Sequence, residues 1–127
     1  MKKIYYLSTC STCRRIIKEI NPDSSFIFQD LKEMPISAIQ LDHLSKLTGG
    51  YASVFNRQAR KYRELSLHSQ ELTEAQIRRY ILNEYTLLKR PIFIVNDKVF
   101  VGNSRKVISA LADHMTNINS KVVNSGT

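Results

Sequence analysis

The order of apolar patterns in this 127-residue sequence predicts an α/β protein with a central mixed sheet of about four strands. A strand, a helix and a strand come first, then a long helical block, then two strands and a last helix. A strand–helix–strand unit within about 30 residues is typical of a βαβ motif. The length suits one domain with a single core. We therefore expect one domain over residues 1–115, in which residues 34–84 form a helical insert.

The first strand is predicted over residues 2–7, because Ile4 to Leu7 are continuous and strong in β-propensity. The helix that follows repeats its apolar residues at a 3–4 spacing, which marks one buried face. These residues are Cys13, Ile16, Ile17 and Ile20. Asn21 to Asp23 should end this helix, because the central proline cannot continue it. Phe26 to Phe28 then predict the second strand.

The helical block should contain at least two helices. Pro35 is expected to open the first, and Gly49-Gly50 to end it. Its apolar residues are Ile39, Leu41, Leu44 and Leu47. A middle piece, residues 51–64, is rich in arginine. Thr73 should begin another helix, because Gln76 three residues later completes a capping box. The buried face of that helix is predicted to be Ile77, Tyr80 and Ile81.

The last part of the chain predicts a hairpin and a helix. Arg90 to Val95 form a strand that its proline introduces, Asn96-Asp97 a tight turn, and Lys98 to Val101 the returning strand. Ser104 can cap the final helix. Its apolar face is Val107, Ile108, Leu111, Ala112 and Met115. Residues 116–127 are polar, and we expect them to be a disordered tail.

The composition favours an anionic partner. With 19 Lys and Arg against 11 Asp and Glu, the net charge is +8, which suits oxyanions, glutathione or an acidic protein, or else a solvated basic surface. The basic residues are spread along the chain, which argues against direct binding to nucleic acid. No apolar run approaches the roughly 20 residues that span a membrane, and only four apolar residues follow Met1 to Lys3. We therefore expect a cytoplasmic protein.

The only two cysteines lie between the first strand and the first helix, within Thr9 to Arg15. In the cytoplasm such a C-x-x-C pair is typical of redox chemistry or metal binding. Cys10 would lie at the helix N-terminus, where free N–H groups, the helix dipole and the charges of Arg14 and Arg15 favour a thiolate. Arg14 is also expected to stabilise an anionic substrate. Cys13 lies one turn further on, so its sulfur can reach Cys10. We predict that Cys10 attacks and that Cys13 resolves the mixed disulfide.

Two other interpretations of this pair stay open. The cysteines could be two small buried hydrophobes. They could also belong to a zinc site, which needs two more ligands. The chain has no second cysteine pair, so such a site would have to be shared between chains. The three histidines are scattered without ligand spacing: His43, His68 and His114. We therefore expect no metal and no resident cofactor.

Arg90 is a candidate for the anion site because it precedes a proline at a strand start. If Pro91 faces the dithiol, the guanidinium of Arg90 would lie near the sulfur. Its planar fork could then bind an oxyanion or a glutathione carboxylate. The alternative is an ordinary surface arginine.

Three segments of the sequence form a recognisable combination of motifs: CSTCR between strand and helix, Tyr62 to Leu65, and Leu87 to Ile92 followed by Val101-Gly102. Together they resemble the arsenate reductase (ArsC)/Spx family over about residues 2–115. The pairing of C-x-x-C with L-x-[KR]-R-P-I is the most specific part. The resemblance implies a thioredoxin-like fold with a helical insert.

The resemblance also implies roles for site residues. Cys10 would be the nucleophile, Pro91 a cis-proline that faces it, and Arg90 an arginine that helps hold an oxyanion. Glutaredoxin-linked arsenate reductases have two further arginines. One lies in the insert, where Arg57 matches and Arg60 is a rival.

Two departures from the arsenate reductases bear on function. The other arginine should follow the last strand, but this chain has Asn103 there, which weakens the case for arsenate. Cys13, which those reductases often lack, shifts the likeness toward Spx-like and reductase-like members. In Spx the dithiol is a redox switch, and the protein binds the C-terminal domain of the RNA polymerase α subunit.

We therefore expect a thiol–disulfide oxidoreductase in which Cys10 and Cys13 form a redox-active disulfide. It would reduce a disulfide, a glutathione adduct or an oxyanion, with glutathione, thioredoxin or glutaredoxin as partner and electron donor. The alternatives are an Spx-like regulator that binds RNA polymerase and an arsenate reductase.

Overall fold

The computed structural model describes residues 1–125 and contains a four-stranded sheet in the order β2-β1-β3-β4. The strands are β1 (Lys2–Tyr6), β2 (Ile27–Asp30), β3 (Ile92–Val95) and β4 (Lys98–Val101). β1 pairs parallel with β2 and antiparallel with β3, which in turn pairs antiparallel with β4. The predicted α/β class and its mixed sheet are confirmed.

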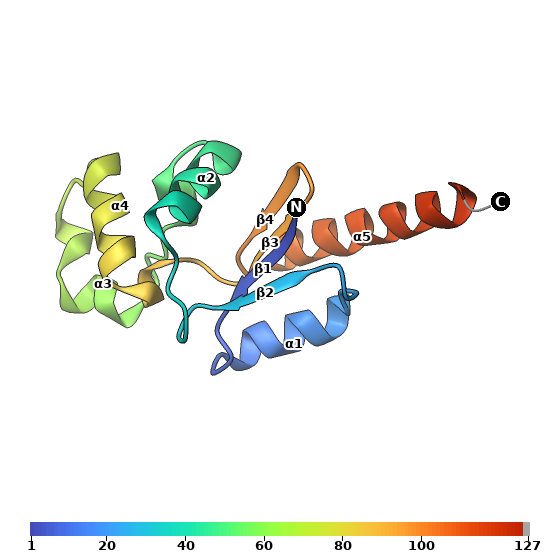
Figure 1. The fold of residues 1–127 in the computed structure, drawn as a ribbon. Helices are drawn as coiled ribbons and strands as arrows, with labels where there is room; N and C mark the ends of the chain where they lie inside the picture. The colour runs from blue at the N-terminus through green and yellow to red at the C-terminus, as the bar shows by residue number, and fades with distance from the viewer. Residues whose placement is uncertain (126–127) are drawn as a thin grey trace.

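Five α-helices and three short 3₁₀ segments are present among residues 1–125 (Figure 1). The helices are α1 (Ser11–Ile20), α2 (Ala38–Thr48), α3 (Arg60–Glu64), α4 (Glu74–Asn83) and α5 (Arg105–Ser125). The 3₁₀ segments are η1 (Tyr51–Val54), η2 (Leu67–Ser69) and η3 (Tyr85–Leu87). Figure 1 shows α2, α3 and α4 gathered at one end of the molecule, away from α1 and α5.

Each face of the sheet is covered by its own apolar cluster. On one face Ile4 and Phe93 pack with residues of α1 and α5. On the other face Tyr5 and Ile92 pack with residues of the helical block. Successive side chains of a strand point to opposite faces, so β1 and β3 contribute alternately to the two clusters. All four residues of β3 are consequently buried, which explains its continuous apolar sequence.

The start of α2 differs from the prediction. Pro35 does not open this helix; Ser37 is its N-cap. The Ser37 hydroxyl accepts from the Gln40 N–H, and the Gln40 side chain accepts from the Ser37 N–H. This capping box gives hydrogen-bond partners to two backbone N–H groups, and a proline side chain has no acceptor that could do so. Ile39 was expected on the apolar stripe, but its side chain is 83% exposed because it lies off the 3–4 spacing of the buried leucines.

The other predicted boundaries are close to those observed. Thr73 and Gln76 form the expected capping box of α4. Asn96 has a left-handed φ of 58° in the turn between β3 and β4. The Ser104 hydroxyl accepts from the Val107 N–H at the start of α5. These features depend on residues close in sequence, which is why the sequence pattern found them.

The final helix is longer than expected. α5 continues to Ser125, so residues 116–125 are helical and the expected disordered tail is wrong for this segment. Ile118 explains part of the extension, because it continues the apolar stripe after Met115 and packs on the same cluster. Residues 126–127, the rest of that expected tail, lie outside the described residues.

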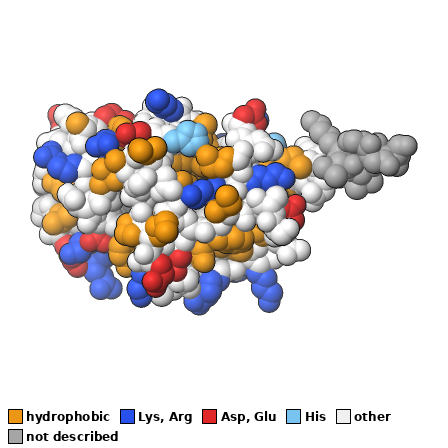
Figure 2. Space-filling view, viewed as in Figure 1, with side chains coloured by type: hydrophobic (Ala, Val, Ile, Leu, Met, Phe, Trp, Pro, Cys, Tyr) orange, Lys and Arg blue, Asp and Glu red, His pale blue; other side chains and the backbone are white. Residues whose placement is uncertain are grey.

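Charged residues are distributed widely on the surface. Figure 2 shows Lys and Arg at several separate places on the visible face, with Asp and Glu among them. Within residues 1–125, every helix is too short or too polar to cross a lipid bilayer.

Candidate active site

Cys10 lies at the junction between β1 and α1. Its N–H donates to the Leu7 carbonyl over 3.1 Å, and it is the N-cap residue of α1 with an extended backbone. The Arg14 N–H donates to the Cys10 carbonyl over 3.1 Å and begins the helical hydrogen bonding. The predicted placement of Cys10 at a strand-to-helix junction is confirmed.

The two thiols differ in exposure. Both are free cysteines; Cys10 is half-buried, whereas Cys13 is fully buried with 0% of its side chain exposed. Cys13 is also part of the apolar face of α1, as its spacing with Ile16 predicted. A reactant from solvent can therefore contact the Cys10 thiol, whereas burial shields the Cys13 thiol from it.

The two thiols also differ in acidity. Burial raises the pKa of Cys10, but hydrogen bonds from the Cys13 N–H and thiol, the charge of Arg90 and the Thr12 N–H together lower it below its ordinary value. Burial, with smaller contributions from the hydrogen bond to Cys10 and from the negative charge of Cys10, raises the pKa of Cys13 to about 11. Cys10 is thus the more acidic thiol of the pair.

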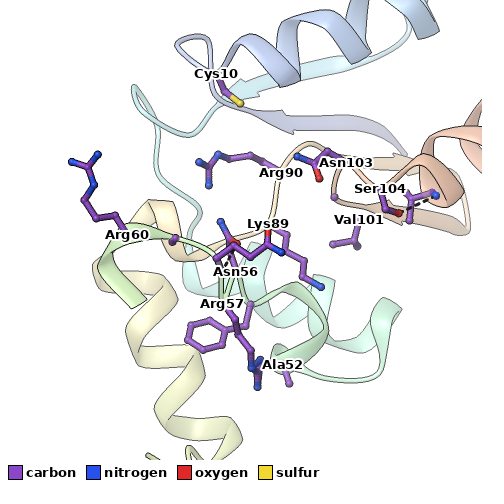
Figure 3. Close-up of a pocket in the computed structure, with 15 residues that line it drawn as sticks. Cys10, Ala52, Asn56, Arg57, Arg60, Lys89, Arg90, Val101, Asn103 and Ser104 are labelled. Carbon is purple, nitrogen blue, oxygen red and sulfur yellow. Dashed lines mark hydrogen bonds between the residues drawn. The ribbon is translucent and has the colours of Figure 1, made fainter. Parts of the chain in front are cut away.

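A cavity of about 730 Å³ opens beside Cys10 (Figure 3). Four basic residues and no acidic residue line it: Arg57, Arg60, Lys89 and Arg90. The remaining lining residues include Asn56, Gln58, Asn103 and Ser104. The cavity thus joins the loop after β1, the segment before α3, the segment before β3 and the loop after β4. Its positive potential favours an anionic reactant.

Arg90 is held in a defined position on this wall. Its Nη1 donates to the carbonyl oxygens of Thr86 at 3.1 Å and Leu88 at 3.3 Å. Its Nε is buried and has no hydrogen-bond partner among the described residues. The peptide bond between Arg90 and Pro91 is cis, as the family resemblance implied. A buried donor without a partner is costly, so the other contacts of Arg90 must offset this cost.

The structure distinguishes the two candidate arginines of the insert. Arg57 and Arg60 both line the cavity. The guanidinium of Arg57 lies over the ring of Phe55, 5.3 Å from its centroid, and Figure 3 shows it beside Ala52, pointing away from Cys10. In the same view the Arg60 side chain extends away from Arg57, toward open space. Arg60 is therefore better placed for a ligand that reaches Cys10.

Two other predicted site residues are not among those that line the cavity. The Arg14 guanidinium donates through Nη1 to the Ser8 carbonyl at 2.8 Å, on the loop that precedes Cys10. The Pro91 carbonyl accepts from the Gly102 N–H at 2.9 Å, which joins β3 to the loop after β4. Within residues 1–125, no group of three or more His, Cys, Asp or Glu side chains could hold a metal ion.

Three further residues line the cavity although no sequence pattern indicates it: Asn56, Lys89 and Ser104. Lys89 is adjacent to Arg90 in the sequence, but adjacency does not show whether its side chain points toward the cavity or away from it. Its N–H donates to the Val54 carbonyl at 2.8 Å, and this contact fixes its place. Asn56 anchors through its side-chain amide, which donates to the Thr86 carbonyl at 3.3 Å. Both contacts are long-range, so no local signal could have revealed them.

The sheet, the dithiol at a helix N-terminus and the cis-proline together define a thioredoxin-like protein with a helical insert. The sequence matches the ArsC family over residues 5–111, so this chain belongs to the ArsC family.

Solved structures with the same fold agree with this assignment. The YFFB protein has a TM-score of 0.71 at 22% identity, covering 88% of this chain and 99% of that chain. An arsenate reductase (ArsC) related protein from Brucella melitensis has a TM-score of 0.65 at 24% identity, covering 86% and 92%. The arsenate reductase from Vibrio cholerae has a TM-score of 0.67 at 20% identity, covering 87% and 94%. A search of curated proteins found no match.

Proposed function

We propose that this protein is a thiol–disulfide oxidoreductase that uses Cys10 as nucleophile and Cys13 as resolving thiol. The observation that carries the proposal is the position of Cys10: a thiol of lowered pKa, at a helix N-terminus, on the wall of a basic cavity. A thiolate in such an environment attacks sulfur, whereas a buried structural cysteine is inert. Membership of the ArsC family supports the same class of chemistry.

The first step is attack on the substrate disulfide. The Cys10 thiolate forms a new bond to one substrate sulfur, and the old sulfur–sulfur bond breaks. The leaving sulfur departs with the electron pair as a thiolate and takes a proton from water. The product is a mixed disulfide between Cys10 and half of the substrate.

The second step needs Cys13 as a thiolate. In the free protein its pKa is about 11, partly because the Cys10 thiolate is next to it. The mixed disulfide removes that negative charge and that hydrogen bond, so the pKa of Cys13 falls when its thiolate is needed. Cys13 then loses its proton to solvent and attacks the Cys10 sulfur. The second half of the substrate leaves as a thiolate, and an external thiol donor later reduces the Cys10–Cys13 disulfide.

The cavity supports an organic anionic substrate. Its volume of about 730 Å³ lies in the range of roughly 300–1,000 Å³ that is typical of small-molecule sites. Arg90 and Arg60 both line the cavity, and their guanidinium groups can donate hydrogen bonds to carboxylates. Glutathione, as donor or as an adduct on a protein thiol, has this chemistry.

The experiment compares wild type with Cys10→Ser and Cys13→Ser. The substrates are glutathione disulfide, a glutathionylated peptide and arsenate, each with glutathione, glutaredoxin or thioredoxin as donor. We expect no turnover by Cys10→Ser. Cys13→Ser should stop at a mixed disulfide, which mass spectrometry detects as the added mass of half the substrate.

Retained activity in Cys10→Ser, or a Cys10 pKa near the ordinary value of about 8.5, would refute the mechanism. Arsenate is expected to be a poor substrate, since Asn103 lines the cavity where the resemblance implies an arginine. Efficient arsenate reduction would favour the arsenate reductase alternative. Oxidation-dependent capture of RNA polymerase without turnover of thiols would favour the regulator.

A further inference from the structure

The thiol of Cys10 is delivered by a tight turn between β1 and α1. The turn runs from Leu7 to Cys10 and is closed by the 3.1 Å hydrogen bond between these two residues, with Ser8 and Thr9 at its centre. Both central residues are exposed, so no apolar packing holds them. The orientation of the turn must therefore depend on its hydrogen bonds.

Asp30 holds one side of this turn. Its Oδ1 accepts from the Ser8 N–H at 3.2 Å and from the Lys32 N–H at 3.2 Å. Asp30 is the last residue of β2 and is opposite Tyr6 in the parallel pairing with β1. The Leu31 N–H also donates to the Tyr6 carbonyl at 2.8 Å. The position of the carboxylate is thus fixed by the sheet, and its hydrogen bond to the Ser8 N–H fixes the turn relative to the sheet.

Arg14 holds the other side. Its Nη1 donates to the Ser8 carbonyl at 2.8 Å, while its backbone N–H donates to the Cys10 carbonyl at 3.1 Å. The peptide between Ser8 and Thr9 is the middle peptide of the turn, and its flip interconverts the two common turn types. A hydrogen bond to the Ser8 carbonyl selects one orientation of that peptide.

We propose that Asp30 and Arg14 are positioning residues that hold Ser8 from both sides and so fix Cys10 at the N-terminus of α1, beside the basic cavity. The inference rests on the proposed function, because it concerns the thiol that performs it. Neither residue lines the cavity, so neither is placed to contact a substrate there. Hydrogen bonds from the Ser8 hydroxyl, then from backbone N–H groups, lower the pKa of Asp30, so it is ionised at neutral pH.

The two roles of Asp30 have effects of opposite sign on Cys10. A negative charge near a thiol disfavours the thiolate, so loss of the charge alone would lower the pKa of Cys10. Loss of the hydrogen bond to Ser8 would instead release the turn, move the sulfur from the helix N-terminus and raise the pKa. The sign of the change therefore separates positioning from simple electrostatics.

The test measures the pKa of Cys10 from the pH dependence of its alkylation by iodoacetamide, in the full chain. Asp30→Ala should raise this pKa by about one unit, which means about tenfold less thiolate at a pH below both values. Asp30→Asn keeps an acceptor oxygen for the Ser8 N–H and should restore the wild-type value or a slightly lower one. Asp23→Ala is the matched control, because Asp23 accepts from the Ser25 N–H at 2.9 Å at the other end of β2.

A second arm does not depend on Asp30. Arg14→Ala and Arg15→Ala each remove one positive charge from α1, but only Arg14 holds Ser8. Arg14→Ala should raise the pKa of Cys10 more than Arg15→Ala does. The positioning role is refuted if Arg14→Ala and Arg15→Ala shift the pKa of Cys10 equally, or if Asp30→Ala leaves that pKa unchanged or lowers it. Neither result would refute the proposed function. An unshifted pKa in the wild type overturns the proposed function and this inference with it.

Discussion

At the scale of single residues, Cys10 and Cys13 show how one helical turn separates two chemical roles. Cys10 faces the cavity at the helix N-terminus, where N–H groups and Arg90 lower its pKa. Cys13 lies on the apolar face of the same helix, and its burial raises its pKa to about 11. The same residue type is therefore the more acidic thiol at one position and the less acidic thiol three positions later.

The arginines of the insert give a matched pair of variants. Arg60→Ala should raise the KM for an anionic disulfide roughly tenfold, the cost of about one charge-assisted hydrogen bond. Arg57→Ala should change it much less, because the Arg57 guanidinium stacks on Phe55 and points away from Cys10 (Figure 3). Steady-state kinetics with glutathione disulfide measure both. A larger effect of Arg57→Ala would reverse the assignment.

Tyr5 predicts a loss of stability at alkaline pH. Burial raises its pKa from 10.0 to about 12, and its side chain is 1% exposed. Between these two values the unfolded chain releases the phenol proton while the folded chain keeps it, so the free energy of unfolding falls as the pH rises. A shift of two units corresponds to at most about 3 kcal/mol.

Tyr5→Phe keeps the ring and removes the proton, so it should abolish this part of the loss. Urea unfolding at several pH values from 9 to 12 provides the measurement. Curves for the two proteins that fall in parallel over this range would contradict the prediction.

At the scale of elements, the helices begin in two different ways. α2 and α4 begin with capping boxes, in which side-chain oxygens satisfy the free N–H groups. No side-chain oxygen caps α1, whose N-cap is Cys10. Backbone N–H groups of Thr12 and Cys13 instead lower the pKa of the Cys10 thiol. α1 therefore begins at a cysteine of lowered pKa and not at a side-chain cap.

Removal of the two capping hydroxyls should affect stability but not the thiol. Ser37→Ala and Thr73→Ala should each lower the free energy of unfolding by about 1 kcal/mol. The pKa of Cys10 should stay at its wild-type value in both, because neither hydroxyl bonds to the Leu7–Cys10 turn and neither residue lines the cavity. Chemical denaturation and the alkylation assay give the two readouts. A variant that shifts the thiol pKa would show that the insert is coupled to the site.

At the scale of the whole molecule, the sheet brings distant parts of the chain to one cavity. Cys10 follows β1, Arg90 precedes β3 and Asn103 follows β4, while the insert supplies Arg57 and Arg60. The antiparallel pairing of β1 with β3 places the end of the first next to the start of the second. This is why the N-terminal dithiol faces an arginine from residue 90.

The net charge of +8 predicts a salt-dependent rate with anionic reactants. Attack on glutathione disulfide should slow as the ionic strength rises from about 0.01 M to 0.5 M, because salt screens the attraction. Attack on hydroxyethyl disulfide, which carries no charge, is the control and should change little. Stopped-flow measurement of both rates checks this. Equal salt dependence for the two substrates would show that the cavity does not select by charge.

Much of the fold was predictable because it depends on neighbours in sequence. The βαβ unit, the hairpin at Asn96 and the capping box at Thr73 all follow from local spacing. The errors have the same origin. The chemistry of Ile39 predicts a place on the apolar stripe, but packing leaves it exposed. The polar composition after residue 116 predicts disorder, but the helix continues to Ser125.

The candidate site divides in the same way. The sequence alone determined the two cysteines, their order at the helix start and the arginine–proline pair, because each is a local pattern. Only the tertiary structure decided that Arg14 holds the Ser8 carbonyl, that Arg57 stacks on Phe55, and that Arg60 lines the cavity. The direction of a long side chain depends on contacts with segments far away in the sequence, and those contacts exist only after the sheet has assembled.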